Sequence, residues 1–362
     1  MKALGFLPII LVSICLLTSS ASYAKALREL NESEVNKLKA NIEKNPENMV
    51  SRRFLALHYF EKKNWVQVTR HLAPVAENLP TPLLRILAKS YVNLGNIRQA
   101  ETIIRIPLSA KTVSPESYLL AAEVYAAKGR SSTINVVSQP AKDLLFETLK
   151  TAQLAYPNNY LIYETRINYL EEFVPHYQYE ALKVLEDMTK NKLKFKPKHY
   201  SMVCKFNHLS GFTKQTTTSC LEAIEKDPST PGNYIYLGQT HINIGEKEKG
   251  MRVLASVGEK FSDSEEALWA TADAYYSNKN LPEAFNYFKK ATNHPDVKPR
   301  DFLGFAKVAF DLKKYDVALM AFDKHCSMTE TLDHEFRRAS GLLKSPLWKA
   351  RFRRKMMNCQ KK

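Results

Sequence analysis

A spacing of 34 residues recurs through the second half of this 362-residue chain. Three sets of positions keep that spacing in the same phase, two of them mostly small residues and one mostly bulky apolar residues. The sets are Cys204, Gly238, Ala272 and Ala306; Thr216, Gly250, Ala284 and Ala318; and Cys220, Leu254, Phe288 and Phe322. Self-similarity at a period of about 20 to 50 residues is typical of solenoids, in which each unit packs only on its neighbours. We therefore expect one long stack of repeats in place of two or three globular domains.

The first half of the chain repeats the pattern less strictly. Small residues are followed three positions later by tyrosine, and prolines close the units. The small residues are Ala56, Ala88 and Ala122, the tyrosines Tyr59, Tyr91 and Tyr125, and the prolines Pro46, Pro80, Pro157 and Pro228. Between the prolines, apolar residues recur every three or four positions, which places them on one face of a helix. Glycines such as Gly95 then interrupt the pattern, so each unit is predicted to be two helices joined by a turn.

This pattern resembles the tetratricopeptide repeat, in which small residues let two helices approach and bulky residues fill the space between successive pairs. One unit matches at Leu87, Ala88, Tyr91, Ala100 and Ile104, and another at Leu237, Gly238, Gly250 and Leu254. The resemblance implies an all-α fold, a right-handed superhelical α-solenoid of helix-turn-helix repeats. It is specific for the fold and says little about function, because one fold hosts many functions.

The repeats divide the chain as follows. Residues 49–332 should hold about eight repeats, with an insertion at 130–140 between two helices and an irregular unit at 160–196. The insertion is either a binding loop or a neutral elaboration of the stack. Residues 25–48 are expected to form an N-terminal capping helix, and residues 333–362 a C-terminal capping helix with a basic tail, because solenoids need covered ends.

The N-terminus has the pattern of an export signal, residues 1–24. Lys2 provides a positive start, Leu4–Leu17 is largely apolar, and small residues end at Ala24. We expect a cleavable signal peptide and a periplasmic protein. The alternatives are an uncleaved membrane anchor with the chain facing the periplasm, and a lipoprotein modified at Cys15.

The chain is basic, with 53 Lys and Arg against 37 Asp and Glu and a net charge of +16. Nucleic acid is a common partner of such chains, but none is expected for an exported protein. An acidic polysaccharide, lipid phosphate or an acidic protein face fits better, and a merely solvated basic surface is the plain alternative. The stretch 348–362 is strongly basic and could dock on an anionic membrane or polymer.

No arrangement of residues points to catalysis. The nine histidines are scattered, and there is neither a metal-binding motif nor a glycine-rich phosphate loop, so we expect no enzyme, no metal and no cofactor. Cys204 and Cys220 lie on the two helices of one unit and could form a disulfide, with two buried thiols as the alternative. Cys326 with Cys359 is the remaining pairing.

A partner-binding face is predicted on the first helices, which line the concave side of such stacks. The residues expected there are Arg53, Arg85, Lys89, Lys205, Tyr236, Gln239, Trp269, Asp273, Tyr276, Lys307 and Phe310. Aromatic side chains mixed with polar ones suit an extended peptide or a helix, and they suit sugar rings nearly as well. Trp269 and Phe310 could instead pack against neighbouring repeats. The leading hypothesis is a non-catalytic periplasmic scaffold in a cell-envelope assembly for secretion, motility or surface-polymer export, and the alternative is a module that binds carbohydrate or an anionic polymer.

Overall fold

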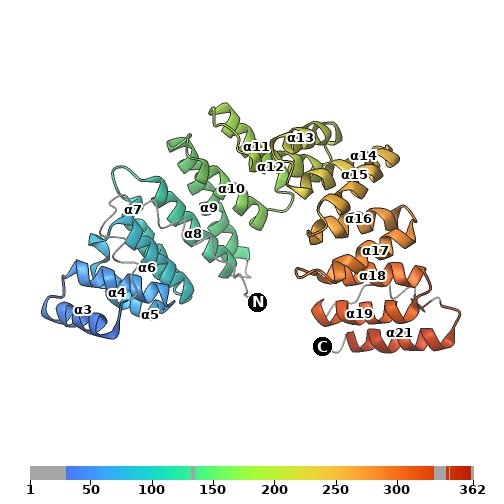
Figure 1. The fold of residues 1–362 in the computed structure, drawn as a ribbon. Helices are drawn as coiled ribbons and strands as arrows, with labels where there is room; N and C mark the ends of the chain where they lie inside the picture. Colours follow the sequence, from blue (N-terminus) through green and yellow to red (C-terminus); the bar gives the residue numbers. More distant parts are fainter. Residues whose placement is uncertain (1–29, 132–134, 330–339, 342, 360–362) are drawn as a thin grey trace. The chain divides into compact units, whose positions relative to one another are not determined.

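The computed structural model of the chain describes residues 30–131, 135–329, 340–341 and 343–359 (Figure 1). All regular structure in this described part is helical. The chain divides into two compact units. Unit 1 comprises residues 1–175 and 190–193, and unit 2 comprises residues 176–189 and 194–362. The predicted signal peptide, residues 1–24, lies outside the described residues.

Unit 1 holds α3 (Glu32–Lys44), α4 (Met49–Glu61), α5 (Trp65–Leu72), the 3₁₀ helix η1 (Ala73–Asn78), α6 (Thr81–Asn93), α7 (Ile97–Leu108), α8 (Pro115–Ser131), α9 (Asn135–Ala155) and α10 (Tyr160–Phe173). Unit 2 holds α11 (Gln178–Lys190), α12 (Pro197–Leu209), α13 (Thr213–Lys226), α14 (Pro231–Asn243), α15 (Lys247–Lys260), α16 (Glu265–Ser277), α17 (Leu281–Thr292), α18 (Pro299–Asp311), α19 (Tyr315–Thr329) and α21 (Pro346–Cys359). None of the helices in the described ranges is long and apolar enough to span a bilayer.

The pair α6 and α7 shows how one repeat forms. Leu87 and Ala88 on α6 and Ile104 on α7 are at most 1% exposed, because residues three or four apart share the face that meets the partner helix. Gly95 lies in the turn between the helices with a φ of 74°, a left-handed conformation that glycine adopts without steric penalty. The spacing of apolar residues therefore sets the helices, and the glycine sets the turn between them.

The small residues of the repeat pattern are where paired helices come closest. A Cβ atom on Gly250 of α15 would lie 2.5 Å from the carbonyl oxygen of Gly238 on α14, and one on Gly238 would lie 2.7 Å from Leu254 Cγ. Both distances are too short for any side chain. The small residues at the 34-residue spacing thus permit the close packing of α14 on α15.

The prolines that close the units act through their carbonyl groups. In three repeats, the side chain six residues after the proline donates a hydrogen bond to the proline carbonyl, which ties the incoming chain to the first turn of the next helix. The pairs are Arg52 Nε with Pro46 (2.7 Å), Tyr163 Oη with Pro157 (3.0 Å) and Tyr234 Oη with Pro228 (3.3 Å). A repeat boundary is therefore fixed by a side chain as well as by the rigidity of proline.

Residues 130–140 differ from the expected insertion. Instead of a loop between helices, the segment largely extends them, since α8 runs to Ser131 and α9 starts at Asn135. Pro140 lies inside α9 near its start. A proline there removes only one hydrogen bond in the second turn of a long helix, which the rest of the helix can tolerate. The third repeat therefore has longer helices, and no binding loop is described there.

The irregular unit at 160–196 contains α10 and α11, joined by a turn over 174–177, and the division between the two units falls within it. At the N-terminus, Asn31 caps α3 by accepting a hydrogen bond from Glu34 N, and the Glu34 carboxylate accepts one from Asn31 N. At the other end, α21 packs against α19. Residues 333–339 of the predicted C-terminal cap lie outside the described part of the chain.

Candidate partner-binding face

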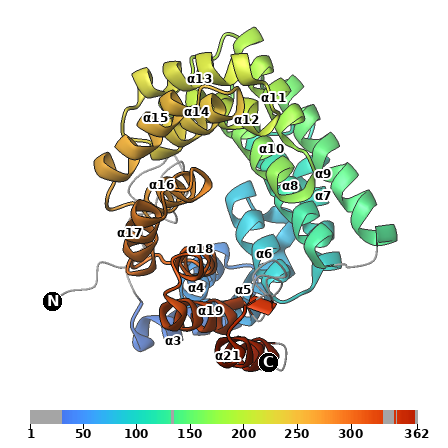
Figure 2. The same ribbon diagram turned by 90° about the vertical axis from the view of Figure 1, so that its right-hand side faces the viewer.

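The first helices of unit 2 lie side by side. In this unit α12 packs next to α14, α14 next to α16, and α16 next to α18. Figure 2 shows α12 and α14 on the inner side of the curve of unit 2, with the second helices α13 and α15 outside them. The predicted binding residues from 205 to 310 all belong to these first helices.

Tyr236 and Gln239 of α14 meet His208 of α12, a residue that the sequence analysis did not single out. The His208 and Tyr236 rings are 5.0 Å apart, and His208 Nδ1 lies 3.1 Å from the Thr240 hydroxyl. Burial lowers the pKa of His208, which a hydrogen bond with Gln239 only partly opposes. His208 is therefore a neutral, half-buried group on the face at neutral pH. His208 falls in the same 34-residue register as the predicted residues Tyr276 and Phe310, which could have identified it.

Asp273 and Tyr276 on α16 lie beside residues of α18. Burial raises the pKa of Asp273, and the positive charge of Lys307 partly opposes the shift. Tyr276 Oη donates a 2.7 Å hydrogen bond to an Asp311 carboxylate oxygen. Asp273 and Lys307 hold equivalent positions in successive repeats, so the face carries opposite charges on neighbouring helices.

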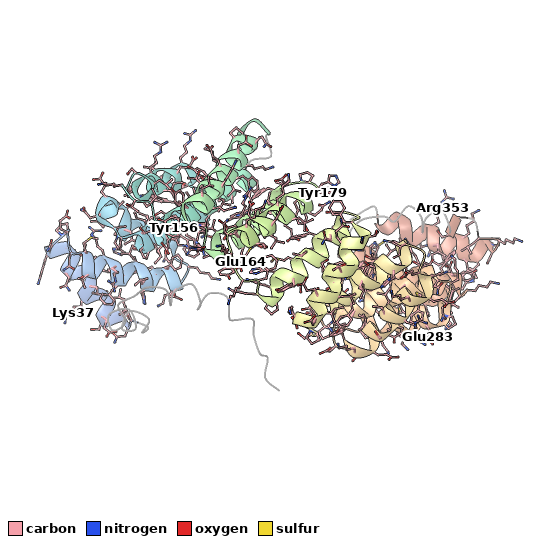
Figure 3. The ribbon with its side chains drawn as sticks, turned by 90° about the horizontal axis from the view of Figure 1, so that it is seen from above. Lys37, Tyr156, Glu164, Tyr179, Glu283 and Arg353 are labelled. Atoms are coloured by element: carbon pink, nitrogen blue, oxygen red, sulfur yellow. A yellow bond between two sulfur atoms is a disulfide. The ribbon has the colours of Figure 1, made fainter. Side chains whose placement is uncertain are left out.

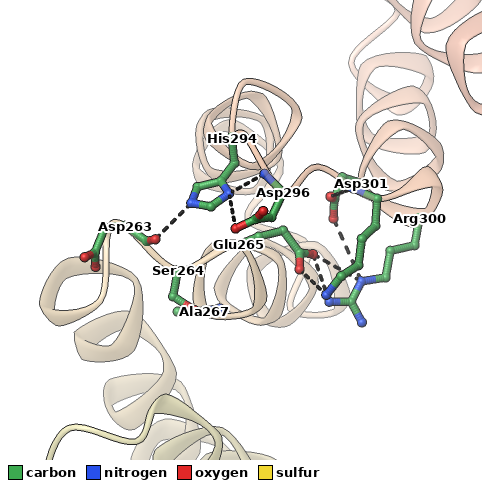
Figure 4. A network of polar contacts seen from close by, with 9 residues as sticks. Asp263, Ser264, Glu265, Ala267, His294, Asp296, Arg300 and Asp301 are labelled. Atoms are coloured by element: carbon green, nitrogen blue, oxygen red, sulfur yellow. Dashed lines mark hydrogen bonds and ion pairs between the residues drawn. The ribbon is translucent and has the colours of Figure 1, made fainter. Parts of the chain in front are cut away.

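Trp269 is partly buried, and its indole ring lies under the guanidinium group of Arg300, at 4.3 Å from the ring centroid. Arg300 Nη2 also donates a 2.8 Å hydrogen bond to Glu265 Oε1, and Lys298 pairs with the same carboxylate (Figure 4). Burial alone would raise the pKa of Glu265, but hydrogen bonds from Lys298 and Arg300 outweigh it and hold the pKa below its usual value. The tryptophan is thus oriented by an ion-pair cluster at the start of α18.

Asp301 completes this cluster and has no exposed surface. Its Oδ2 accepts a 2.7 Å hydrogen bond from Lys298 N, while its Oδ1 lies 3.9 Å from Arg300 Nε. Burial raises the pKa of Asp301 to about 6, with the nearby charge of Glu265 adding to the shift. Close by, His294 Nε2 bonds the Asp263 carbonyl oxygen at 2.9 Å, so the cluster joins two successive repeat boundaries (Figure 4).

Phe310 does not contribute to an open face. Its ring lies 5.5 Å from Tyr315 of α19 and 5.6 Å from Phe352 of α21, so it packs under the C-terminal helix. Lys205, at the other end of the face, lies with its ammonium group 5.7 Å from the Phe206 ring. Among the predicted residues of unit 2, Phe310 is therefore covered by α21, the capping helix that follows the last regular repeat.

The three predicted residues of unit 1 share its first helices. Arg85 and Lys89 on α6 both pair with Glu123 of α8, at 3.4 and 4.0 Å. Arg53 is partly buried, with its guanidinium 5.8 Å from the Phe54 ring. Its neighbour Arg52, which the sequence analysis missed, is 7% exposed and donates a 2.9 Å hydrogen bond to the carbonyl oxygen of His71 on α5.

Cys204 on α12 and Cys220 on α13 are joined by a disulfide, with their Cα atoms 4.6 Å apart. Both are fully buried, so the bond ties the two helices of one repeat from within the core. Cys326 is disulfide-bonded as well. The side chain of its predicted partner, Cys359, lies outside the described residues.

The side chains predicted to bind a partner are aromatic, amide and charged groups. Among the described residues, no three histidine, cysteine, aspartate or glutamate side chains are placed to hold a metal ion. The aromatic, amide and charged side chains on α12 to α18 can instead offer contact area and directional hydrogen bonds to a partner.

Comparisons with known proteins find one family model and several solved structures. The family described as anaphase-promoting complex, cyclosome, subunit 3 matches residues 257–325. A tetratricopeptide repeat protein from Parabacteroides merdae is similar in structure with a TM-score of 0.52 at 12% identity, over 76% of this chain and 98% of that one. The C-terminal part of a repeat-containing protein from Cytophaga hutchinsonii gives a TM-score of 0.47 at 15% identity, over 70% and 98% of the two chains. None of the curated proteins matches the sequence.

The chain is an all-helical solenoid of helix-turn-helix repeats. Its fold is that of tetratricopeptide repeat proteins such as the one from Parabacteroides merdae.

Proposed function

We propose that this protein is an exported scaffold that holds a protein segment on the inner face of unit 2, within an assembly of the cell envelope. The observation that carries the proposal is the set of partly exposed side chains on consecutive first helices, from Tyr236 and Gln239 on α14 to Asp273 and Tyr276 on α16. Each first helix adds its own pair of contacts, so a bound segment would run across the helices.

The charges on the face suggest what such a segment carries. Asp273 is half-buried and its pKa is raised by burial, which disfavours the charged carboxylate. A cation that approaches this carboxylate would therefore stabilise its charged form. Lys205 and Lys307 lie one or two repeats away on either side. A segment with a Lys or Arg near Asp273 and acidic residues on either side matches this order of charges.

The periplasmic location is part of the proposal. It rests on the apolar segment at 4–17 and the small residues before position 25. The disulfide between Cys204 and Cys220 supports an oxidising compartment, where such bonds persist. Fractionation of cells, with the mature N-terminus determined by mass spectrometry, tests this part. A chain that keeps residues 1–24 and stays in the cytosol would contradict it.

Photocrosslinking in cells tests the binding face. A photoreactive residue at Gln239 should capture a protein partner, whereas the same residue at Arg252, exposed on the second helix α15, should not. The change Asp273→Asn should reduce the yield at Gln239 by about tenfold, since losing one charge contact in a half-buried site changes affinity by roughly that factor. Equal capture at both positions, or no partner at all, would reject the proposal.

A carbohydrate or anionic-polymer module remains the second candidate function. The observation in its favour is the net charge of +16 together with Trp269 and Tyr236, whose rings could stack on sugars. Binding of an acidic polysaccharide should then weaken with salt and with replacement of Arg53, Arg85 and Lys89 by Ala. Binding that is indifferent to both changes would exclude this function.

A further inference from the structure

Helix α21 differs in charge from the second helices that precede it in unit 2. Its sequence, PLWKARFRRKMMNC, contains five basic residues and no acidic one. By contrast, α13, α15, α17 and α19 each carry at least one Asp or Glu together with Lys. A solvated helix normally mixes both signs, because ion pairs along its surface stabilise it. The concentration of one sign on the last helix needs a separate explanation.

One side of α21 packs against the preceding repeat. Phe352 is fully buried, and its ring lies 5.6 Å from Phe310, while Trp348 lies 5.3 Å from Tyr315. These contacts fix the orientation of the helix, because side chains four positions apart share one face.

Two of the five cations flank this buried side and are compensated by α19. Arg351 bonds an Asp316 carboxylate oxygen at 3.0 Å, and Lys355 pairs with Asp323 at 2.8 Å. Arg351 also covers the Trp348 ring. These two residues therefore attach the cap to the repeat below it.

The other three cations, Lys349, Arg353 and Arg354, are exposed. None of their side chains has an ion-pair or hydrogen-bond partner in the described part of the chain. Arg353, labelled in Figure 3, lies on the outer surface of the helix. Leu347 is 65% exposed in the first turn, and helical periodicity places it with Arg354 on the side opposite Phe352.

We propose that the exposed surface of α21, with Leu347 and Arg354 opposite Phe352 and with Lys349 and Arg353 along one flank, docks the protein on an anionic lipid surface. Cations near such a surface are attracted to its lipid phosphates, and an exposed leucine among them can enter the headgroup region. A hydrophilic polysaccharide would use the cations and leave the leucine without a role. The combination of an apolar residue with charges that have no partner among the described residues therefore favours lipid.

Vesicle binding by the full chain tests the charges. The measured quantity is the ratio of binding to vesicles with about a third phosphatidylglycerol over binding to neutral phosphatidylcholine vesicles, so that an N-terminal apolar segment affects both terms alike. Changing Lys349, Arg353 and Arg354 to Gln should lower this ratio roughly 100-fold at low salt. The matched control changes Lys37, Lys44 and Lys62 to Gln, which removes the same charge from exposed positions in unit 1.

The control variant should keep the ratio of the unchanged protein. Equal losses in both variants would mean that net charge alone acts, and no loss in the first would mean that α21 is not the docking face. Either result overturns the proposal. Leu347→Ser should weaken vesicle binding at high salt too, since the apolar contact is not screened. Binding to soluble alginate with none to either vesicle would assign the surface to a polymer and reject lipid.

Discussion

Individual residues in the turns set part of the stability of this solenoid. The turn residue has a positive φ in several repeats, and it is glycine at Gly95, Gly211 and Gly245 but lysine at Lys279 and Lys313, with φ of 63° and 61°. A side chain in the left-handed region costs about 1 kcal/mol relative to glycine. The repeat therefore tolerates a strained residue where the next helix fixes the turn.

Replacing Lys279 and Lys313 by Gly should raise the free energy of unfolding of unit 2 by about 0.5 to 1 kcal/mol for each change, because the strain disappears. The gain is less than the full strain, since glycine loses more backbone entropy on folding. Urea denaturation followed by circular dichroism measures it. Lys289→Gly, inside α17, is the control and should lower stability by about 1 kcal/mol. A loss in all three variants would contradict the role of the turn.

Gly250 tests the close contact of α14 with α15. Gly250→Ala should destabilise the protein by about 1 to 3 kcal/mol, because the new methyl group would overlap the Gly238 carbonyl at 2.5 Å. Gly232→Ala is the matched control in α14, where a Cβ would meet Tyr236 at an ordinary 3.6 Å, and it should be neutral or stabilising. Thermal melting of both variants compares them. Equal melting temperatures would show that the two helices can separate at little cost.

At the scale of elements, the first turn of α18 has a pH-dependent attachment to α16. Burial raises the pKa of Asp301 to about 6, above the usual 3.8. A carboxyl group whose pKa is higher in the folded state stabilises the fold while it is protonated, and this contribution is lost as the pH rises from about 4 to about 6. At pH 7 the buried charge is therefore a net cost to unit 2.

Asp301→Asn should remove that cost and keep the hydrogen bond from Lys298 N. We expect the variant to be more stable than the unchanged protein at pH 7, by up to about 3 kcal/mol, with the difference shrinking to near zero below about pH 4. The midpoints of urea denaturation of both proteins, measured from pH 4 to about pH 8, test this expectation. The pKa of Glu265 is lowered, so this residue contributes stability to the fold that is lost on acidification. The same residue is present in both proteins, so it does not change the difference between them. A difference that is constant with pH would contradict the charge on Asp301.

The sequence predicts those parts of the helices that depend on patterns within one repeat. The 34-residue spacing and the prolines predict the helix pairs of unit 2, since both act within one repeat. The sequence analysis did not predict that residues 130–140 largely extend two helices. Helix extension there depends on partner helices in space and not on the Ser, Thr and Val content of the segment. The role of Lys298 and Asp301 was missed for the same reason, since it depends on Glu265 from the preceding repeat.

At the scale of the whole molecule, the stability of a solenoid is a sum of terms from neighbouring repeats, so a crosslink should act mainly on its own part of the stack. The disulfide between Cys204 and Cys220 lies in unit 2 and closes a segment with a sequence separation of 16. Closing a loop of that length is worth about 3 kcal/mol. Its removal should therefore lower the stability of unit 2 and leave that of unit 1 unchanged.

The three tryptophans make this measurable, because Trp65 lies in unit 1 whereas Trp269 and Trp348 lie in unit 2. In the double variant Cys204→Ala and Cys220→Ala, a chain whose only tryptophan is Trp65 should keep its urea midpoint. A chain whose only tryptophan is Trp269 should unfold at a clearly lower urea concentration. A common shift of both probes would show that the two units unfold as one cooperative body, in which a bond in one repeat stabilises all of them. Separate midpoints would instead locate the weakest coupling of the stack in the irregular repeat at 160–196, where the chain divides into its two units.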